Sequence, residues 1–276
     1  MTPPTVRQAL AQSGLVLVDA QVLLAHALGR DRAWLIAHAA DPLSLEDADR
    51  FFALAGRRRD GEPVAYLTGW REFWGLRLAV DPSVLIPRPE TETLVEIALA
   101  RLPADRASRV LDLGTGSGAI ALAIASERPR SQVVATDRSQ AALALARANA
   151  KRLGIANVSF AQADWYEGLP PAAPGGFDLI ASNPPYVAAG DAHLREGDLR
   201  FEPIAALAAG GDGLDALRVI VAGAPARLVA GGWLAVEHGY DQSDAVERLC
   251  AAVGLEGIMH ARDLAGIPRV VAGRRD

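Results

Sequence analysis

The chain has 276 residues, of which 50% are apolar and 22% charged, and its formal net charge is −5. This composition excludes a disordered chain, and the acidic balance argues against a protein that coats nucleic acid. The single cysteine, Cys250, excludes a disulfide framework and a cysteine metal cluster. Because residues 1–12 do not resemble a secretion signal and the longest apolar run is Ala119–Ala125, we expect a cytoplasmic protein without membrane segments.

Residues 6–59 show helical spacing of apolar side chains, as in Leu23, Leu24 and Leu28. Turn signals such as Ser13-Gly14 and Asp41-Pro42 interrupt this pattern. The region therefore predicts about four short helices, and we place a helical domain at residues 1–65.

Residues 66–82 change character, because aromatic residues and a glycine precede the short apolar run Leu76–Val80. This pattern predicts a hairpin that links two domains. The following segment, 81–92, contains three prolines and leads into a helix expected at Thr93–Leu102. Such a stiff loop suits a position over a ligand.

From Arg109 onward, apolar strand patterns alternate with helical ones. The expected strands are Arg109–Leu113, Gln132–Thr136, Val158–Gln162, Phe177–Ser182 and Trp233–Glu237. The expected helices are Ala119–Glu127, Ser139–Leu153, Gly213–Val229 and Ser243–Ala252. Two last strands, near Leu255–Ala261 and Pro268–Ala272, have no room for a helix between them and should pair antiparallel. We predict an α/β doubly wound sheet with a reversed edge in a domain spanning 83–276, and a surface loop at Leu169–Gly176.

A glycine-rich loop follows the first strand of this domain. It consists of Gly114, Thr115, Gly116, Ser117 and Gly118. Alternate glycines let the backbone turn sharply and approach a ligand that faces the next helix. Asp137, at the end of the second strand, is placed to accept hydrogen bonds from ribose hydroxyls. Together these features fit any ribose cofactor, including NAD.

Two further features favour S-adenosylmethionine over a dinucleotide. The glycine pattern is G-x-G-x-G, and Asp112 before it would repel a pyrophosphate but suits a cationic group. At the end of the third strand, Asp164 could meet the adenine amino group and Trp165 could lie beside the adenine ring. A core role is the alternative for Trp165, and we favour the adenine contact.

A donor-poor corner follows the strand Phe177–Ser182. It consists of Asn183, Pro184, Pro185 and Tyr186. Prolines have no N–H group, and the side-chain oxygen of Asn183 adds another acceptor. Such a corner suits a substrate that presents an –NH2 group, with Tyr186 supplying a ring against a flat group. The alternative is a rigid turn with a buried tyrosine.

These motifs resemble the class I methyltransferase family, and within it the HemK/PrmC group of protein-(glutamine-N5) methyltransferases. The resemblance covers nearly the whole chain. It rests on Gly61–Gly69, Ile86–Glu92, Asp112–Gly118, Asn183–Tyr186 and Phe201–Pro203. The first two motifs are far more specific than the glycine loop.

The resemblance implies methyl transfer from S-adenosylmethionine, with S-adenosylhomocysteine as product, to the glutamine of a Gly-Gly-Gln loop in class 1 peptide chain release factors. It implies a Rossmann-like sheet with an antiparallel last strand, and release-factor recognition by residues 1–65. The implied cofactor contacts are Gly114, Thr115, Gly116, Ser117, Gly118, Asp137, Trp165 and Asn183, and the position of Asp164 at the end of the third strand adds that residue. Asn183, Pro184, Pro185 and Tyr186 would hold the glutamine, and Asn183, Pro184 and Tyr186 would act in catalysis. We expect a monomer without a metal ion and without direct nucleic-acid binding.

Three other functions remain open from the sequence. An adenine-N6 methyltransferase poses the same –NH2 problem, but the helical region lacks the strongly basic surface such an enzyme would bring. A sibling glutamine methyltransferase that acts on a ribosomal protein is the second alternative. A catalytically silent adaptor is opposed by the glycine loop together with Asn183. Glu90 and Glu202 are possible assisting groups to which we assign no role.

Overall fold

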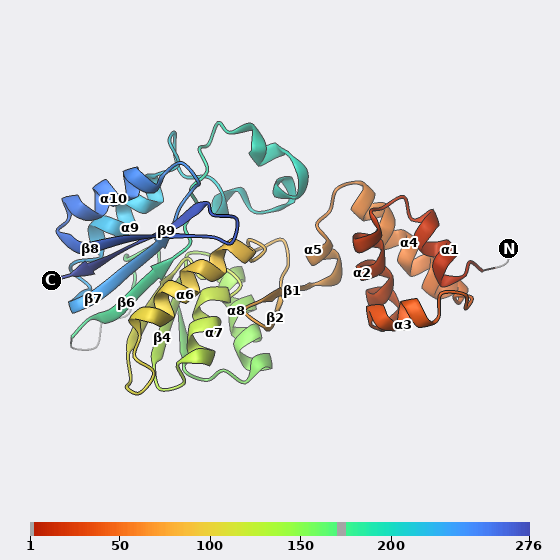
Figure 1. Ribbon diagram of the computed structural model, residues 1–276, viewed down its shortest axis with the longest axis horizontal. Coiled ribbons are helices and arrows are strands. Elements are labelled where there is room, and N and C mark those ends of the chain that lie inside the picture. Colours follow the sequence, from red (N-terminus) through yellow and green to blue (C-terminus); the bar gives the residue numbers. More distant parts are fainter. Residues whose placement is uncertain (1–2, 170–174) are drawn as a thin grey trace. The chain divides into compact units, whose positions relative to one another are not determined.

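The computed structural model describes residues 3–169 and 175–276 (Figure 1). The central part of the expected surface loop Leu169–Gly176 lies outside these residues. The chain divides into two compact units. One comprises Met1–Trp70 with Glu196–Phe201, and the other Arg71–Arg195 with Glu202–Asp276.

The first unit is helical, as the apolar spacing predicts. Its helices are α1 (Val6–Gln12), α2 (Leu17–Leu28), α3 (Arg32–Ala37), α4 (Leu45–Arg59) and α5 (Val64–Thr68). Local side chains define where α1 and α4 begin: Thr5 forms a capping box with Gln8, and Ser44 accepts the Asp47 N–H at the start of α4. The core is built around Leu23, Leu24 and Phe51. Within the same unit, Arg58 pairs with Asp19 (2.8 Å) and Asp198 (2.7 Å) and so attaches the segment Glu196–Phe201.

A seven-stranded sheet forms the centre of the second unit. Its strands are β3 (Arg109–Leu113), β4 (Gln132–Asp137), β5 (Val158–Gln162), β6 (Phe177–Ser182), β7 (Leu228–Glu237), β8 (Leu255–Arg262) and β9 (Pro268–Arg275). The strand order is β5-β4-β3-β6-β7-β9-β8, with β3 to β7 parallel and β9 antiparallel to both neighbours. This confirms the predicted doubly wound sheet with an antiparallel last strand.

Helices cover both faces of this sheet (Figure 1). They are α6 (Glu92–Arg101), α7 (Ala119–Glu127), α8 (Gln140–Leu153), α9 (Asp215–Gly223) and α10 (Ser243–Ala252). Alternation along β3 separates the two cores: Val110 packs with α6 and α7, whereas Leu111 and Leu113 pack with α9 and α10. No described helix is both long and apolar enough to cross a membrane.

Two details differ from the sequence prediction. The helix expected at Gly213–Val229 is shorter, because Pro225 cannot continue a helix and Val229 already belongs to β7. The reversed strand β9 is not the edge of the sheet, because it lies between β7 and β8. Its run Val270–Ala272 is at most 1% exposed, as expected for an inner strand, whereas β8 carries polar side chains to the edge.

The predicted hairpin is present as β1 (Trp70–Phe73) and β2 (Leu76–Ala79). Its turn residues, Trp74 and Gly75, have φ values of 52° and 67°. A positive φ is unfavourable for tryptophan, but two contacts hold it there: its backbone N–H donates to Glu92 (2.8 Å) and its indole N–H to Glu127 (3.1 Å).

Candidate active site

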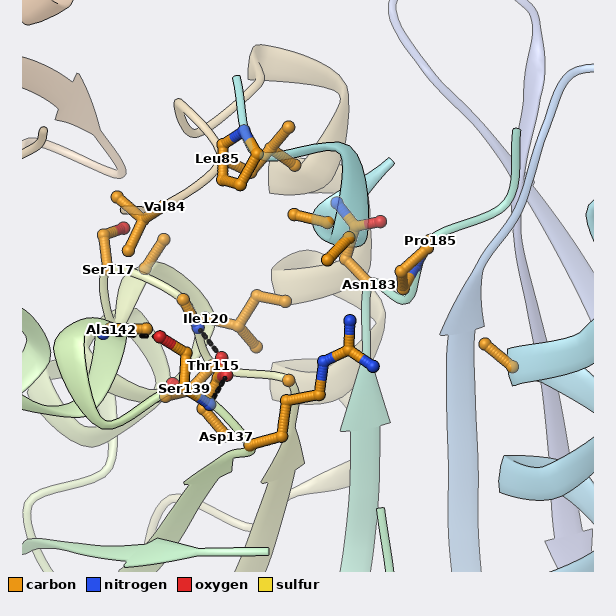
Figure 2. A pocket seen from close by; sticks show the side chains of 18 of the residues that line it. Val84, Leu85, Thr115, Ser117, Ile120, Asp137, Ser139, Ala142, Asn183 and Pro185 are labelled. Atoms are coloured by element: carbon orange, nitrogen blue, oxygen red, sulfur yellow. Dashed lines mark hydrogen bonds between the residues drawn. The ribbon is translucent and has the colours of Figure 1, made fainter. Parts of the chain in front are cut away.

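A cavity of about 430 Å³ opens at the carboxyl ends of the parallel strands in the second unit. The chain proceeds from β3 outward to β5 and then returns to β6 beside β3, so this is the point where the strand order reverses. Open α/β sheets bind ligands at such a point. Figure 2 shows Asp137 and Ser139 on one side of the cavity and Asn183 and Pro185 on the opposite side.

Most of the residues selected from the sequence line this cavity. They are Gly114, Thr115, Gly116, Ser117, Asp137, Asp164, Trp165, Asn183 and Pro185. The other three, Gly118, Pro184 and Tyr186, do not line it. Gly118 instead caps α7 with a φ of 88°, and a Cβ atom there would lie 3.0 Å from the Leu122 side chain. Both the backbone conformation and the packing at position 118 therefore favour glycine.

Asp137 holds the glycine loop in place. Its two carboxylate oxygens accept the N–H groups of Gly116 (2.9 Å) and Ser139 (2.8 Å). The Thr115 N–H donates to the Thr136 carbonyl (2.8 Å), so loop and strand end are joined twice. The carboxylate has further lone pairs, and it lies at the cavity wall where ribose hydroxyls would need acceptors.

Asp112 lies beneath the loop and does not line the cavity. Its Oδ2 atom accepts the Thr115 hydroxyl (2.6 Å) and the Ala121 N–H (3.2 Å). Complete burial raises the pKa of its carboxyl group to about 7, and the nearby Asp137 charge adds to the shift. The structure therefore gives Asp112 the task of anchoring the loop, and the cationic group expected beside it has no direct access to its side chain.

The raised pKa of Asp112 makes a prediction about stability. Between pH 4 and 7 the folded protein holds a proton here that the unfolded chain releases, so this stabilising contribution is complete below about pH 4 and is lost as the pH rises to 7. Asp112→Asn lacks this loss. From pH 5 to pH 8 its unfolding free energy should therefore gain on the wild type by roughly 2–3 kcal/mol. Urea unfolding of both cofactor-free proteins measures this, and parallel pH curves would contradict it.

Trp165 both lines the cavity and packs in the core, so its core role is confirmed and its contact with adenine stays a prediction. Its φ of 50° turns it toward the glycine loop, where a Cβ atom at Gly114 would lie 3.5 Å from its ring. The ring also packs against the apolar cluster around β6 and α9. Asp164 and Glu167 exchange backbone hydrogen bonds, which fixes the turn that carries both Asp164 and Trp165 to the cavity.

One polar side-chain atom of Asn183 has a hydrogen-bond partner and the other has none within the described part of the chain. Its Nδ2 donates to the Thr91 hydroxyl (3.0 Å), and its Oδ1 is buried without a partner among the described residues. A buried acceptor without a partner is costly, and a ligand can remove that cost. Pro184 is buried and Pro185 lines the cavity. Because proline has no N–H group, neither residue can donate a backbone hydrogen bond to Oδ1.

Tyr186 is fixed at both ends. Its hydroxyl donates to Glu237 (3.1 Å), and its carbonyl accepts from the Gln242 side chain (3.0 Å). Burial raises the pKa of this hydroxyl, and the Glu237 carboxylate raises it further. The phenol therefore stays protonated and acts as a donor.

Two sequence motifs meet at Glu202. Its buried carboxylate accepts the Ile86 N–H (3.1 Å) and pairs with Arg88. The proline-stiffened loop is thereby fixed over the cavity, where Val84, Leu85 and Arg88 are lining residues (Figure 2). Glu202 is a support for this loop, and its carboxylate does not line the cavity.

Sequence reasoning missed two residues behind the corner, Thr91 and Glu237. Thr91 lies in the motif Ile86–Glu92. Glu237 ends the predicted strand Trp233–Glu237, and an acidic residue at the carboxyl end of a strand in such a sheet indicates a position near the site. Among the described residues, no group of three or more His, Cys, Asp or Glu side chains is arranged to hold a metal ion.

Comparison with known proteins places this architecture in a family. Residues 5–69 match the family described as "PrmC N-terminal domain", and residues 104–218 match "Methyltransferase domain". A methyltransferase structure from Pyrococcus furiosus shares the fold, with a TM-score of 0.53 at 16% identity over 80% of this chain and 96% of that one.

Curated relatives match over almost the full length. "Release factor glutamine methyltransferase" of Xylella fastidiosa is 53% identical over 99% of this chain and 98% of its own. The protein of the same name from Bordetella pertussis is 53% identical over 96% of this chain and 97% of its own. The chain belongs to the release factor glutamine methyltransferase family.

Proposed function

We propose that the protein transfers a methyl group from S-adenosylmethionine to the side-chain amide nitrogen of the glutamine in the Gly-Gly-Gln motif of class 1 peptide chain release factors. The observation that carries this proposal is the unpartnered, buried Oδ1 of Asn183, a residue that lines the cavity together with the glycine loop. An amide N–H is the complement of this acceptor.

The cavity suits the cofactor. Gly114 to Ser117 would contact it through the loop backbone, Asp137 would accept its ribose hydroxyls, and Asp164 with Trp165 would meet its adenine. S-adenosylmethionine, when bound, supplies a methyl group on a sulfonium that becomes a neutral thioether as the methyl leaves.

The residues of the corner would prepare the glutamine amide. Its nitrogen is a weak nucleophile because its lone pair is delocalised into the carbonyl, and the ~18–20 kcal/mol barrier to rotation about a peptide bond shows how strong such conjugation is. Asn183 Oδ1 and the Pro184 carbonyl would accept the two N–H groups and direct the lone pair toward the methyl. Tyr186, held by Glu237, would fix the plane of the amide. Alignment of this kind is worth ~7–11 kcal/mol in favourable systems.

No strong base is required, because the methylated amide cation readily releases a proton to water. Glu202 is committed to Ile86 and Arg88 and is not assigned this step. The proposal further includes a cytoplasmic monomer that does not bind nucleic acid directly. Residues 1–65 would recognise the release factor, 66–82 would link the domains, and 83–276 would carry the reaction.

Incubation with methyl-labelled S-adenosylmethionine and purified release factor tests this function. Peptide mass spectrometry should place one methyl group on the glutamine of the Gly-Gly-Gln motif. A release factor with that glutamine replaced by glutamate is the control and should remain unlabelled. Label on a ribosomal protein or on RNA instead of release factor would refute the proposal.

A further inference from the structure

The corner Asn183–Tyr186 is held differently at its two ends. At its beginning it continues from β6, whose last residue, Ser182, donates its hydroxyl to the Leu113 carbonyl (2.7 Å). The two prolines that follow cannot donate backbone hydrogen bonds, so they do not extend the pairing of the sheet. At its other end, the backbone carbonyl of Tyr186 accepts a hydrogen bond from the side chain of Gln242.

The side-chain amide of Gln242 joins three segments of backbone. Gln242 is the N-cap residue of α10, but its side chain forms no capping hydrogen bond with that helix. Its Nε2 donates to the carbonyls of Tyr186 (3.0 Å) and Asp212 (3.3 Å), and its Oε1 accepts the Gly239 N–H (2.8 Å). Backbone carbonyls only accept and a backbone N–H only donates, so these three partners determine the orientation of the amide.

The end of the corner also contacts a wall of the cavity. Directly after Tyr186, Val187 forms backbone hydrogen bonds with Leu207 and Ala209 (2.9 Å each), and Ala209 lines the cavity. Gly213 lies so close that a Cβ atom there would be 2.2 Å from the Tyr186 carbonyl oxygen. Because these segments are in direct contact, a shift of the Tyr186 carbonyl would displace both the corner and this wall.

We propose that Gln242 is a positioning residue for methyl transfer. Through the Tyr186 carbonyl it fixes the end of the corner, and so keeps Asn183 Oδ1 and the Pro184 carbonyl where they accept the N–H groups of the substrate amide. Gln242 itself does not line the cavity, so it acts through Tyr186. A displacement of about 1 Å caused far from the reacting atoms can lower a rate about 10²-fold. This inference rests on the proposed function.

Two substitutions of Gln242 test whether its N–H groups are required. Gln242→Met keeps the length of the side chain and removes all three hydrogen bonds. Gln242→Glu, ionised at pH 8, keeps an acceptor for the Gly239 N–H and places a negative charge at a helix N-terminus, where it is stabilising, but it has no donor for Tyr186. We expect both variants to lower kcat at least tenfold.

The affinity for S-adenosylhomocysteine, measured by calorimetry, should change less than threefold in both variants, because the glycine loop and Asp137 lie on other strands. Gln132→Ala is the matched control. Gln132 is an exposed glutamine that begins β4 and does not line the cavity, so its replacement should keep the wild-type kcat and affinity.

A double-mutant cycle with Asn183→Ala separates positioning from a general loss of structure. If Gln242 acts by positioning the corner, Gln242→Met should lower single-turnover methylation less than threefold when Asn183 is already alanine. The same factor in both backgrounds would overturn the inference, as would wild-type kcat in Gln242→Glu. If Gln242→Glu does not fold, Gln242→Met decides, and wild-type kcat in that variant would also overturn it. Absence of glutamine methylation by the wild type would instead refute the proposed function.

Discussion

Asn183→Ala is expected to lower kcat for glutamine methylation at least 100-fold while the dissociation constant for S-adenosylmethionine rises less than about tenfold. The reason is that Asn183 lines the cavity and its Oδ1 is a buried acceptor without a partner among the described residues. Removing one preoriented hydrogen-bonding group from a catalytic site typically costs 10²–10³ in kcat. The effect on the cofactor is smaller because its main contacts are assigned to the glycine loop and Asp137.

Single-turnover methylation and calorimetric cofactor binding measure the two quantities separately. Gln140→Ala is a matched control, since it removes an exposed side-chain amide whose partner is Gln162 at 2.9 Å. That variant should keep both values. Near-normal turnover in Asn183→Ala would refute the acceptor role of Asn183.

Asp137→Ala is expected to weaken binding of S-adenosylmethionine about 100-fold or more. The carboxylate accepts two backbone N–H groups that shape the glycine loop, and its remaining lone pairs are assigned to ribose hydroxyls. Hydrogen bonds to charged groups contribute about 1.5–3 kcal/mol each, and 1.4 kcal/mol corresponds to a factor of ten. Loss of two such bonds therefore accounts for the expected change.

Calorimetry of cofactor binding checks this prediction. Asp178→Ala is the matched control. Asp178 lies on β6, accepts the backbone N–H of Arg109 (2.7 Å) and does not line the cavity. It should leave cofactor affinity within about threefold of the wild type. An Asp137→Ala protein that binds the cofactor as tightly as the wild type would show that the ribose site lies elsewhere.

The sequence predicted the strands of the second unit closely because each is a short buried run bounded by turn residues. β3, β5 and β6 match their expected bounds. The predicted end of the helix α9 was wrong because apolar residues continue from this helix through Pro225 into β7. The inner position of β9 was not predicted. Of the two last strands, the one buried on both faces pairs with β7, and only the apolar run Val270–Ala272 indicates which strand that is.

In the site, too, local sequence patterns predicted some features, whereas contacts between distant parts of the chain could not be predicted. The glycine loop, Asp137 and Asn183 follow predicted strands directly, so their common location at the carboxyl edge could be inferred from the alternating pattern. Thr91 could not be connected with Asn183, nor Glu237 with Tyr186, since the members of each pair lie far apart along the chain and meet only when the sheet forms. Glu202 was recognised in a motif, but its role as a support for Ile86 and Arg88 required the structure.

The acceptor corner is tested most directly by a crystal structure of the protein with S-adenosylhomocysteine and a release factor. We predict that the glutamine side-chain nitrogen lies about 2.7–3.2 Å from both Asn183 Oδ1 and the Pro184 carbonyl oxygen, with the thioether sulfur on the opposite side of the methyl position. A glutamine amide bound by other groups, or turned so that its carbonyl oxygen faces Asn183, would contradict the account.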